Sequence, residues 1–199
     1  MMYKITPMEE CIMKQKITTK KIVLVGVLAA LTAVSSALRI TMPLEIAGTT
    51  SFHLGNILCA LSGILLGPWL GGLAAGLGSA IYDMFNPLYI SECWMTFLMK
   101  FVYGMAAGLV IRAGKKDWGY VKALLGTIAG AVAYALLYLA KSYFYSGLLV
   151  HGLEPAAALA TVVAKLPATC FNAAVAIIIA PVLAIAIRKA LRKQNLSAE

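Results

Sequence analysis

The sequence has 199 residues, of which 61% are hydrophobic and 13% are charged, and its mean hydropathy is +0.86. This apolar content exceeds what a soluble domain of this size needs for one core, so a soluble globular protein is excluded and lipid is the expected solvent. The formal net charge is +9. Because the basic residues lie in short runs beside apolar segments, this charge indicates membrane orientation and not nucleic-acid binding.

Six apolar segments are candidates for membrane-spanning helices, each of which needs roughly 20 apolar residues. The second and third are short, rich in glycine and separated by Gly67-Pro68, so we expect a tightly packed helical hairpin there. The segments lie at about 22–38, 53–67, 70–85, 92–112, 119–145 and 156–188. We therefore predict an all-α integral membrane protein. Its six-helix bundle occupies residues 21–190, between a basic leader at 1–20 and a tail at 191–199.

Three basic clusters determine the expected orientation. They lie at Lys14–Lys21, Arg112–Lys122 and Arg188–Lys193. With six spans all three lie on one side of the membrane, which the positive-inside rule makes the cytoplasm, whereas five or seven spans would divide them. We therefore expect both termini in the cytoplasm and a multi-pass protein of the bacterial plasma membrane.

Three lysines are predicted to lie inside spans, where a charge at the helix centre costs about 2.5 to 3.5 kcal/mol on insertion scales. Each lysine belongs to a polar stripe with spacings of three or four residues, which places the stripe on one helical face. The stripes are Glu92, Thr96, Lys100 and Tyr103; Tyr134, Tyr138, Lys141 and Tyr145; and Thr161, Lys165, Ala168 and Asn172. If they face one another, they line a cavity that opens to the outside.

These stripes supply the predicted substrate site. The lysines suggest a ligand with an anionic or strongly accepting group, and the tyrosines suggest a flat ring. The alternative is a structural role, in which Lys141 snorkels to the interface and the other two lysines pair with Glu92 or Asp83. The candidate binding residues are Glu92, Thr96, Lys100, Tyr103, Tyr138, Lys141, Tyr145, Lys165 and Asn172.

Small residues recur along the first predicted span and form a smooth stripe suited to close helix contact. The stripe consists of Gly26, Ala29, Ala30 and Ala33. Such spacing is common in membrane helices, so it is consistent with packing inside the chain as well as with a partner interface.

Motifs for catalysis and for nucleotide binding are missing from the sequence. It contains no GxxxxGK[ST] loop, no HExxH and no GxSxG motif, and its four cysteines lack metal-ligand spacing. We therefore predict a protein that is not an enzyme and holds no metal or cofactor. Any energy for uphill movement of a solute has to come from elsewhere.

Four motifs follow the basic leader in a fixed order. They are Gly26-x-x-Ala29-Ala30-Leu31, Phe52-His53-Leu54-Gly55-Asn56, Leu66-Gly67-Pro68-x-x-Gly71 and Gly76-x-Gly78-x-x-x-x-Asp83. In this order they resemble the substrate-binding S component of energy-coupling factor (ECF) vitamin transporters, over most of residues 20–190.

The resemblance implies a six-helix protein that captures a vitamin or related micronutrient from outside. It implies three partner subunits, a membrane coupling protein and two cytoplasmic ATPases, and toppling of the loaded S component in the bilayer. It also implies that Gly26 and Ala30 occupy the family's AxxxA motif, which meets the coupling protein. Substrate contacts are implied from the first outer loop, about 39–52, and from the outer ends of helices four to six. The competing interpretation is a self-sufficient permease or channel that acts as a homo-oligomer.

Overall fold

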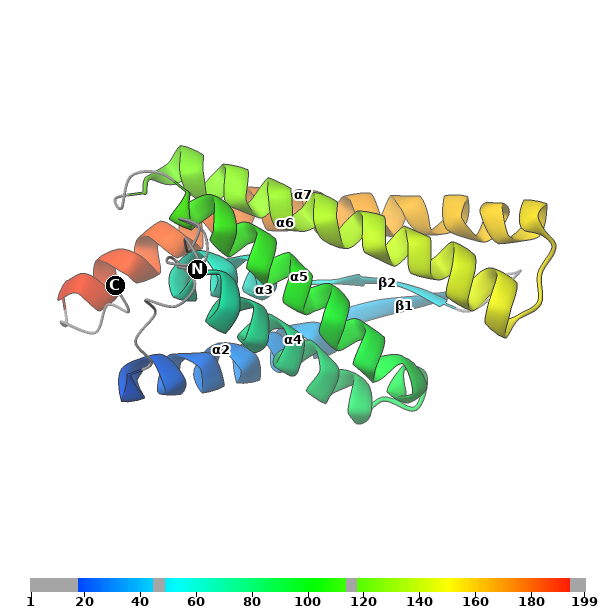
Figure 1. Ribbon diagram of the computed structural model, residues 1–199, viewed down its shortest axis with the longest axis horizontal. Coiled ribbons are helices and arrows are strands. Elements are labelled where there is room, and N and C mark those ends of the chain that lie inside the picture. Colours follow the sequence, from blue (N-terminus) through cyan, green and yellow to red (C-terminus); the bar gives the residue numbers. More distant parts are fainter. Residues whose placement is uncertain (1–17, 45–48, 114–117, 194–199) are drawn as a thin grey trace, which may run out of the picture.

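The computed structural model describes residues 18–44, 49–113 and 118–193, and most of them are helical. The helices run side by side in an elongated bundle, and a two-stranded hairpin lies along it (Figure 1). The elements are α2 (Thr19–Ala37), β1 (Arg39–Pro43), β2 (Thr49–His53), α3 (Gly55–Leu66), α4 (Pro68–Met84), η1 (Ile90–Glu92), α5 (Cys93–Arg112), α6 (Tyr120–Ala140), η2 (Lys141–Val150) and α7 (Pro155–Lys193). The predominantly helical fold is thus confirmed.

Four stretches in the described part are long and apolar enough to cross a membrane. They are Thr19–Ala37, Ile90–Arg112, Tyr120–Val150 and Pro155–Lys193. The remaining two predicted spans correspond to α3 and α4, which have only 12 and 17 residues. The structure therefore supports a multi-pass membrane protein, whereas the count of six spans remains a prediction.

The first predicted outer loop contains regular structure that the helix-based prediction did not include. Strands β1 and β2 pair in antiparallel register, with Arg39 opposite His53 and Pro43 opposite Thr49. The segment favours strands because four of its ten strand residues are β-branched, namely Ile40, Thr41, Thr49 and Thr50. Proline is tolerated because it lies at the end of an edge strand. As a result the next helix begins at Gly55 and not at the predicted residue 53.

A second difference concerns the fifth predicted span, 119–145. Helix α6 ends at Ala140, and the chain continues to Val150 as the π-helix η2. A π-helix is hydrogen-bonded from i to i+5, so side chains beyond residue 140 leave the face that an α-helical spacing predicts.

Glycines allow α3, α4 and α5 to approach one another closely. Gly67 alone connects α3 to α4; its φ is +82°, a conformation that glycine adopts without strain, and Pro68 begins the next helix. A Cβ atom on Gly63 would lie 2.2 Å from the carbonyl oxygen of Gly104, and one on Gly71 would lie 2.4 Å from that of Ser62. The expected tight hairpin therefore forms, with α5 packed against it.

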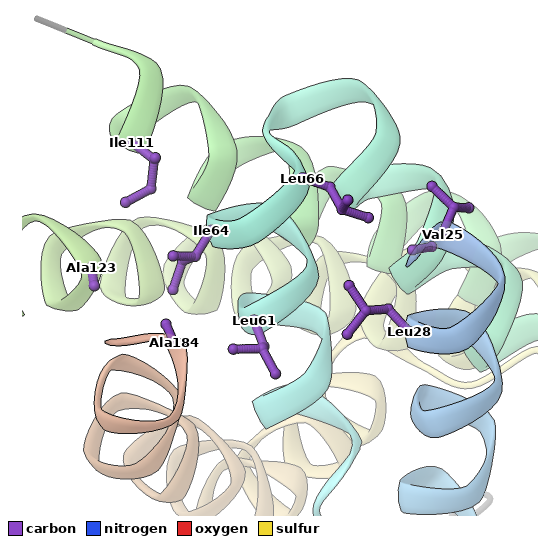
Figure 2. Packing of buried hydrophobic residues seen from close by; sticks show 9 residues of the cluster. Val25, Leu28, Leu61, Ile64, Leu66, Ile111, Ala123 and Ala184 are labelled. Atoms are coloured by element: carbon purple, nitrogen blue, oxygen red, sulfur yellow. The ribbon is translucent and has the colours of Figure 1, made fainter. Parts of the chain in front are cut away.

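An apolar cluster fills one end of the bundle (Figure 2). It joins residues from the first half of α2, the second half of α3, the middle of α4, the end of α5, the beginning of α6 and the last part of α7. Its members include Val25, Leu28, Leu61, Ile64, Leu66, Ile111, Ala123 and Ala184. Figure 1 shows that α2 begins and α7 ends at this same end of the bundle, so the described basic residues of all three clusters lie beside this apolar core.

The glycine contacts predict a specific packing defect. Gly63→Ala places a methyl group against the Gly104 backbone, which cannot move without displacing α5, so we expect a loss of about 1 to 3 kcal/mol in unfolding free energy. Thermal unfolding of the purified protein in detergent measures the effect. Gly26→Ala is the matched control because its Cβ would meet nothing within 4 Å. Equal melting temperatures for the two variants would contradict this packing.

Candidate functional site

A cavity of about 390 Å³ lies in the half of the bundle away from the apolar cluster. Its walls come from the end of α2, the hairpin, the end of α4 with the connection to η1, η1 and the beginning of α5, the end of α6, η2 and the first half of α7. The volume falls within the range of about 300 to 1,000 Å³ that is usual for small-molecule sites. The bundle is therefore apolar and filled at one end, and polar and hollow at the other.

Seven of the nine predicted binding residues line this cavity. They come from η1, α5, the end of α6, η2 and α7, which the sequence expectation placed around one space. The seven are Glu92, Thr96, Lys100, Tyr138, Lys141, Lys165 and Asn172. Tyr103 and Tyr145 are not among the lining residues.

Tyr103 lies at the base of a stack of three tyrosine rings and is completely buried. Its ring centroid is 5.8 Å from that of Tyr134, and Tyr134 is 5.8 Å from Tyr138, with interplanar angles of 19° and 18°. Gly130 leaves room for the stack, since a Cβ there would lie 2.3 Å from the Tyr103 ring. Tyr103 thus packs behind the Tyr134 and Tyr138 rings, which line the cavity, but does not line the cavity itself.

Tyr145 leaves the predicted stripe because it lies in the π-helix. Ser146 lines the cavity in its place, while the Tyr145 ring packs edge-on against Trp94 at 6.5 Å. Ser146 also donates a 3.5 Å hydrogen bond to Glu92. The spacing of four residues from Lys141 fails as a guide here because the helical period changes at residue 141.

The three lysines have different surroundings. Lys141 forms an ion pair with Glu92, which joins η2 to η1. Lys100 donates to the side-chain oxygen of Asn56 and lies 3.8 Å from the centroid of the Tyr134 ring. Lys165 donates to Ser142 at 3.3 Å. The structural alternative had Lys141 snorkelling and the other two lysines paired with carboxylates. In the described residues it is Lys141 that pairs with Glu92, whereas neither of the other two lysines has a carboxylate within 4.0 Å.

Asn172 holds the hairpin against α7. Its side-chain oxygen accepts a 2.9 Å hydrogen bond from the His53 amide, and its side-chain nitrogen donates a 2.8 Å bond to the Ser51 carbonyl. The side-chain amide therefore pairs with one N–H donor and one carbonyl acceptor of the β2 backbone, as a neighbouring strand would. Asn172 lines the cavity, but these contacts make it a residue that positions the cavity wall.

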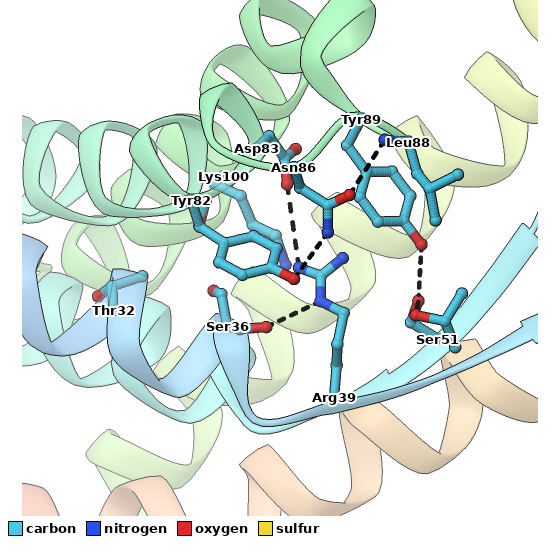
Figure 3. Close-up of polar contacts among 12 residues, drawn as sticks. Thr32, Ser36, Arg39, Ser51, Tyr82, Asp83, Asn86, Leu88, Tyr89 and Lys100 are labelled. Carbon is cyan, nitrogen blue, oxygen red and sulfur yellow. Dashed lines mark hydrogen bonds and ion pairs between the residues drawn. The ribbon is translucent and has the colours of Figure 1, made fainter.

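Arg39 forms a polar cluster (Figure 3). Arg39 lies at the start of the loop, about 39–52, from which the family resemblance implied substrate contacts, but it was not among the nine individually predicted residues. Its guanidinium carbon lies 4.1 Å from the centroid of the Tyr82 ring and 4.8 Å from that of Tyr89. Its Nε donates to the Ser36 carbonyl at 2.8 Å, and Nη2 lies 3.9 Å from the Asp83 carboxylate. The sequence held one indication of this role, because Arg39 directly follows the first span and belongs to none of the three basic clusters.

Tyr89 links the hairpin to the connection between α4 and η1. Its hydroxyl is hydrogen-bonded to the hydroxyls of Thr49 at 3.1 Å and Ser51 at 3.0 Å. Burial by itself raises the pKa of the Tyr89 phenol, but its hydrogen bonds with hydroxyl groups and the nearby Arg39 outweigh burial and lower that pKa below its ordinary value. These contacts attach one wall of the cavity to another.

The residues available to hold a ligand are polar side chains and not a metal-binding set. Within residues 18–44, 49–113 and 118–193, no group of three or more His, Cys, Asp and Glu side chains could hold a metal ion. Two further cavity residues, His53 and His151, were not predicted, and the Nδ1 atom of His53 is buried without a hydrogen-bond partner in this described part.

The predicted small-residue stripe on α2 is divided by the fold. Gly26 and Ala30 are exposed and Ala33 is half-buried, so these three form a continuous outer stripe. Ala29 is only 6% exposed and packs against α4, where a Cβ on Gly78 would lie 2.3 Å from its carbonyl oxygen. Ala29 therefore belongs to packing within the chain.

The family model of the ECF-type riboflavin transporter, S component, matches residues 16–189. The chain belongs to this family. A Pyrococcus woesei protein described as "uncharacterized protein in gap 3'region" is 31% identical over 118 residues, which cover 59% of this S component and 74% of that protein. The resemblance read from the sequence motifs is thus confirmed, and with it a role as a substrate-binding subunit in membrane transport.

The contacts of Asn172 in the S component give a prediction about the cavity wall. Asn172→Ala removes two hydrogen bonds to β2, each worth about 0.5 to 1.5 kcal/mol, so we expect the His53 amide to exchange its proton roughly tenfold faster or more. Hydrogen exchange followed by mass spectrometry measures this. Cys170→Ala, at an exposed position on the same helix, is the control. Unchanged exchange of β2 in Asn172→Ala would refute the positioning role.

Proposed function

We propose that this S component is the high-affinity substrate-capture subunit of an ATP-driven ECF importer. It binds a small water-soluble vitamin or related micronutrient in an outward-facing pocket. It then delivers this substrate together with a membrane coupling protein and two cytoplasmic ATPases. The observation that carries the proposal is the polar cavity of about 390 Å³ at one end of an otherwise apolar bundle.

The distribution of charge supports an outward cavity. The described basic residues at the beginning of α2, the end of α5, the beginning of α6 and the end of α7 lie at the end filled by the apolar cluster. The positive-inside rule assigns that end to the cytoplasm. With both termini there and α3 and α4 counted as short spans, the protein has six spans in a bacterial plasma membrane.

The lining of the cavity supports a planar, polar substrate. Tyr134 and Tyr138 present stacked rings, and lysine, hydroxyl and amide groups surround them. Aromatic faces with a few convergent polar groups are typical of sites for small heteroaromatic molecules. The nine residues proposed to contribute to this site are Glu92, Thr96, Lys100, Tyr103, Tyr138, Lys141, Tyr145, Lys165 and Asn172, of which Tyr103 and Tyr145 act from behind the wall.

Two features support the need for partners. The sequence has no GxxxxGK[ST] loop, so ATP hydrolysis is assigned to other subunits. The outer stripe of Gly26, Ala30 and the half-buried Ala33 would let another helix approach α2 closely. We assign this stripe to the coupling protein.

Uptake assays separate this function from that of a self-sufficient permease or homo-oligomeric channel. We expect cells that express the S component with a coupling protein and two ATPases to take up a labelled vitamin from a panel that contains riboflavin, the vitamin named by the family, riboflavin 5′-phosphate, nicotinamide and nicotinate. Cells that express the S component alone should take up none above background. Equal uptake in the two strains would reject the S-component mechanism and favour the permease.

The stripe on α2 gives a second test, which needs no knowledge of the substrate. Gly26→Leu adds a bulky side chain where nothing lies within 4 Å, so the chain should still fold while its contact with the coupling protein is blocked. We expect co-purification with the coupling protein to fall by at least tenfold. Ala174→Leu, at an exposed position of α7, is the matched control. Undiminished co-purification of Gly26→Leu would rule out this interface.

A further inference from the structure

The charged groups that line the cavity do not balance. Within the described residues, its wall contains four cationic side chains and two carboxylates. The cations are Arg39, Lys100, Lys141 and Lys165, and the carboxylates are Asp83 and Glu92. The cavity therefore has two more positive than negative groups, inside a protein whose surroundings are largely hydrocarbon.

Both carboxylates are already engaged. Glu92 pairs with Lys141, and Asp83 lies 3.9 Å from the guanidinium of Arg39. The surplus charge therefore belongs to Lys100 and Lys165, which have no carboxylate within 4.0 Å in the described part of the chain. Their exposed fractions are only 4% and 5%. Buried ammonium groups without counter-ions are unfavourable, so each needs a compensating contact.

Lys165 is the less compensated of the two. Lys100 donates to Asn56 and lies 3.8 Å from the centre of the Tyr134 ring, which is a close cation–π contact. Lys165 lies 5.7 Å from the centre of the Tyr138 ring, near the limit of such contacts, and its hydrogen bond to Ser142 is long at 3.3 Å. An ammonium group has three N–H donors, so donors of Lys165 remain for a ligand.

We infer that the substrate binds as an anion, and that Lys165 receives its carboxylate or phosphate group beside the Tyr138 ring. This inference rests on the proposed function and narrows its substrate class from any planar micronutrient to an acidic one. Carboxylate and phosphate share the chemistry that an ammonium group recognises, namely negative oxygen atoms that accept charge-assisted hydrogen bonds. Such a group would also supply the counter-ion that the buried ammonium group lacks.

Matched pairs of neutral and acidic compounds test this inference on the purified full-length protein. Riboflavin against riboflavin 5′-phosphate tests a phosphate, and nicotinamide against nicotinate tests a carboxylate on an identical ring. We expect the acidic member of at least one pair to bind tenfold or more tightly than its neutral partner in calorimetry. If neutral members bind as tightly as acidic ones, or if neither acid binds, the inference is overturned.

Variants of Lys165 show whether this residue is responsible. Lys165→Gln should reduce the preference for the acid to threefold or less, and Lys165→Arg should retain it. Lys189→Gln, which removes the same charge from an exposed position at the other end of the bundle, should leave the preference unchanged. A full preference in Lys165→Gln would exclude Lys165 as the anion site.

Stability without ligand gives a readout that a structural lysine would not share. Because Lys165→Gln removes a buried charge without a counter-ion, we expect its melting temperature to equal or exceed that of the wild type. A clearly lower melting temperature would indicate a structural lysine and contradict the inference. If the protein prefers the neutral compounds but still binds the coupling protein, only the inference of an anionic substrate is rejected. If the protein does not bind the coupling protein, the proposed function is rejected.

Discussion

A charge inside a membrane-embedded bundle has to be paired, hydrogen-bonded or placed against an aromatic face, and the cavity of this S component follows from that constraint. Lys141 is paired with Glu92, Lys100 has an amide and a tyrosine ring, and Arg39 lies between two tyrosine rings beside Asp83. Lys165 has only a long bond to a serine and a distant ring. The group with the least compensation is the group with the most capacity to bind a ligand.

Close packing at the other end makes this arrangement possible. Gly63, Gly71 and Gly104 bring α3, α4 and α5 into backbone contact, and the apolar cluster fills the space beside them. Larger residues would hold these helices apart. Because one end is closed and filled by apolar contacts, the polar groups collect at the opposite end, where they surround the cavity.

The hairpin completes the cavity wall through polar contacts. Asn172 binds the backbone of β2 from α7, and Tyr89 binds the hydroxyls of Thr49 and Ser51 from the connection between α4 and η1. The hairpin is thereby attached to both sides of the bundle. These contacts are hydrogen bonds of modest individual strength, so this wall should open more easily than the apolar end.

The sequence by itself determined the membrane environment, the helical fold and the family, because these depend on composition, local periodicity and ordered motifs. Helical spacing also predicted that Thr96, Lys100, Lys141 and Lys165 lie on faces that could meet, and the structure places all four in the lining of one cavity. Only the tertiary structure decided the role of each residue. In the structure Ser146 lines the cavity and the predicted Tyr145 does not, because the helix becomes a π-helix at Lys141. In the structure Ala29 is buried within the chain, and the side chain of Asn172 is hydrogen-bonded to the hairpin. The sequence could not show either role, because contacts between segments distant in sequence leave no local pattern. For the same reason the contacts of Arg39, which come from α2, α4 and the connection after it, could not be read from its neighbours in the chain.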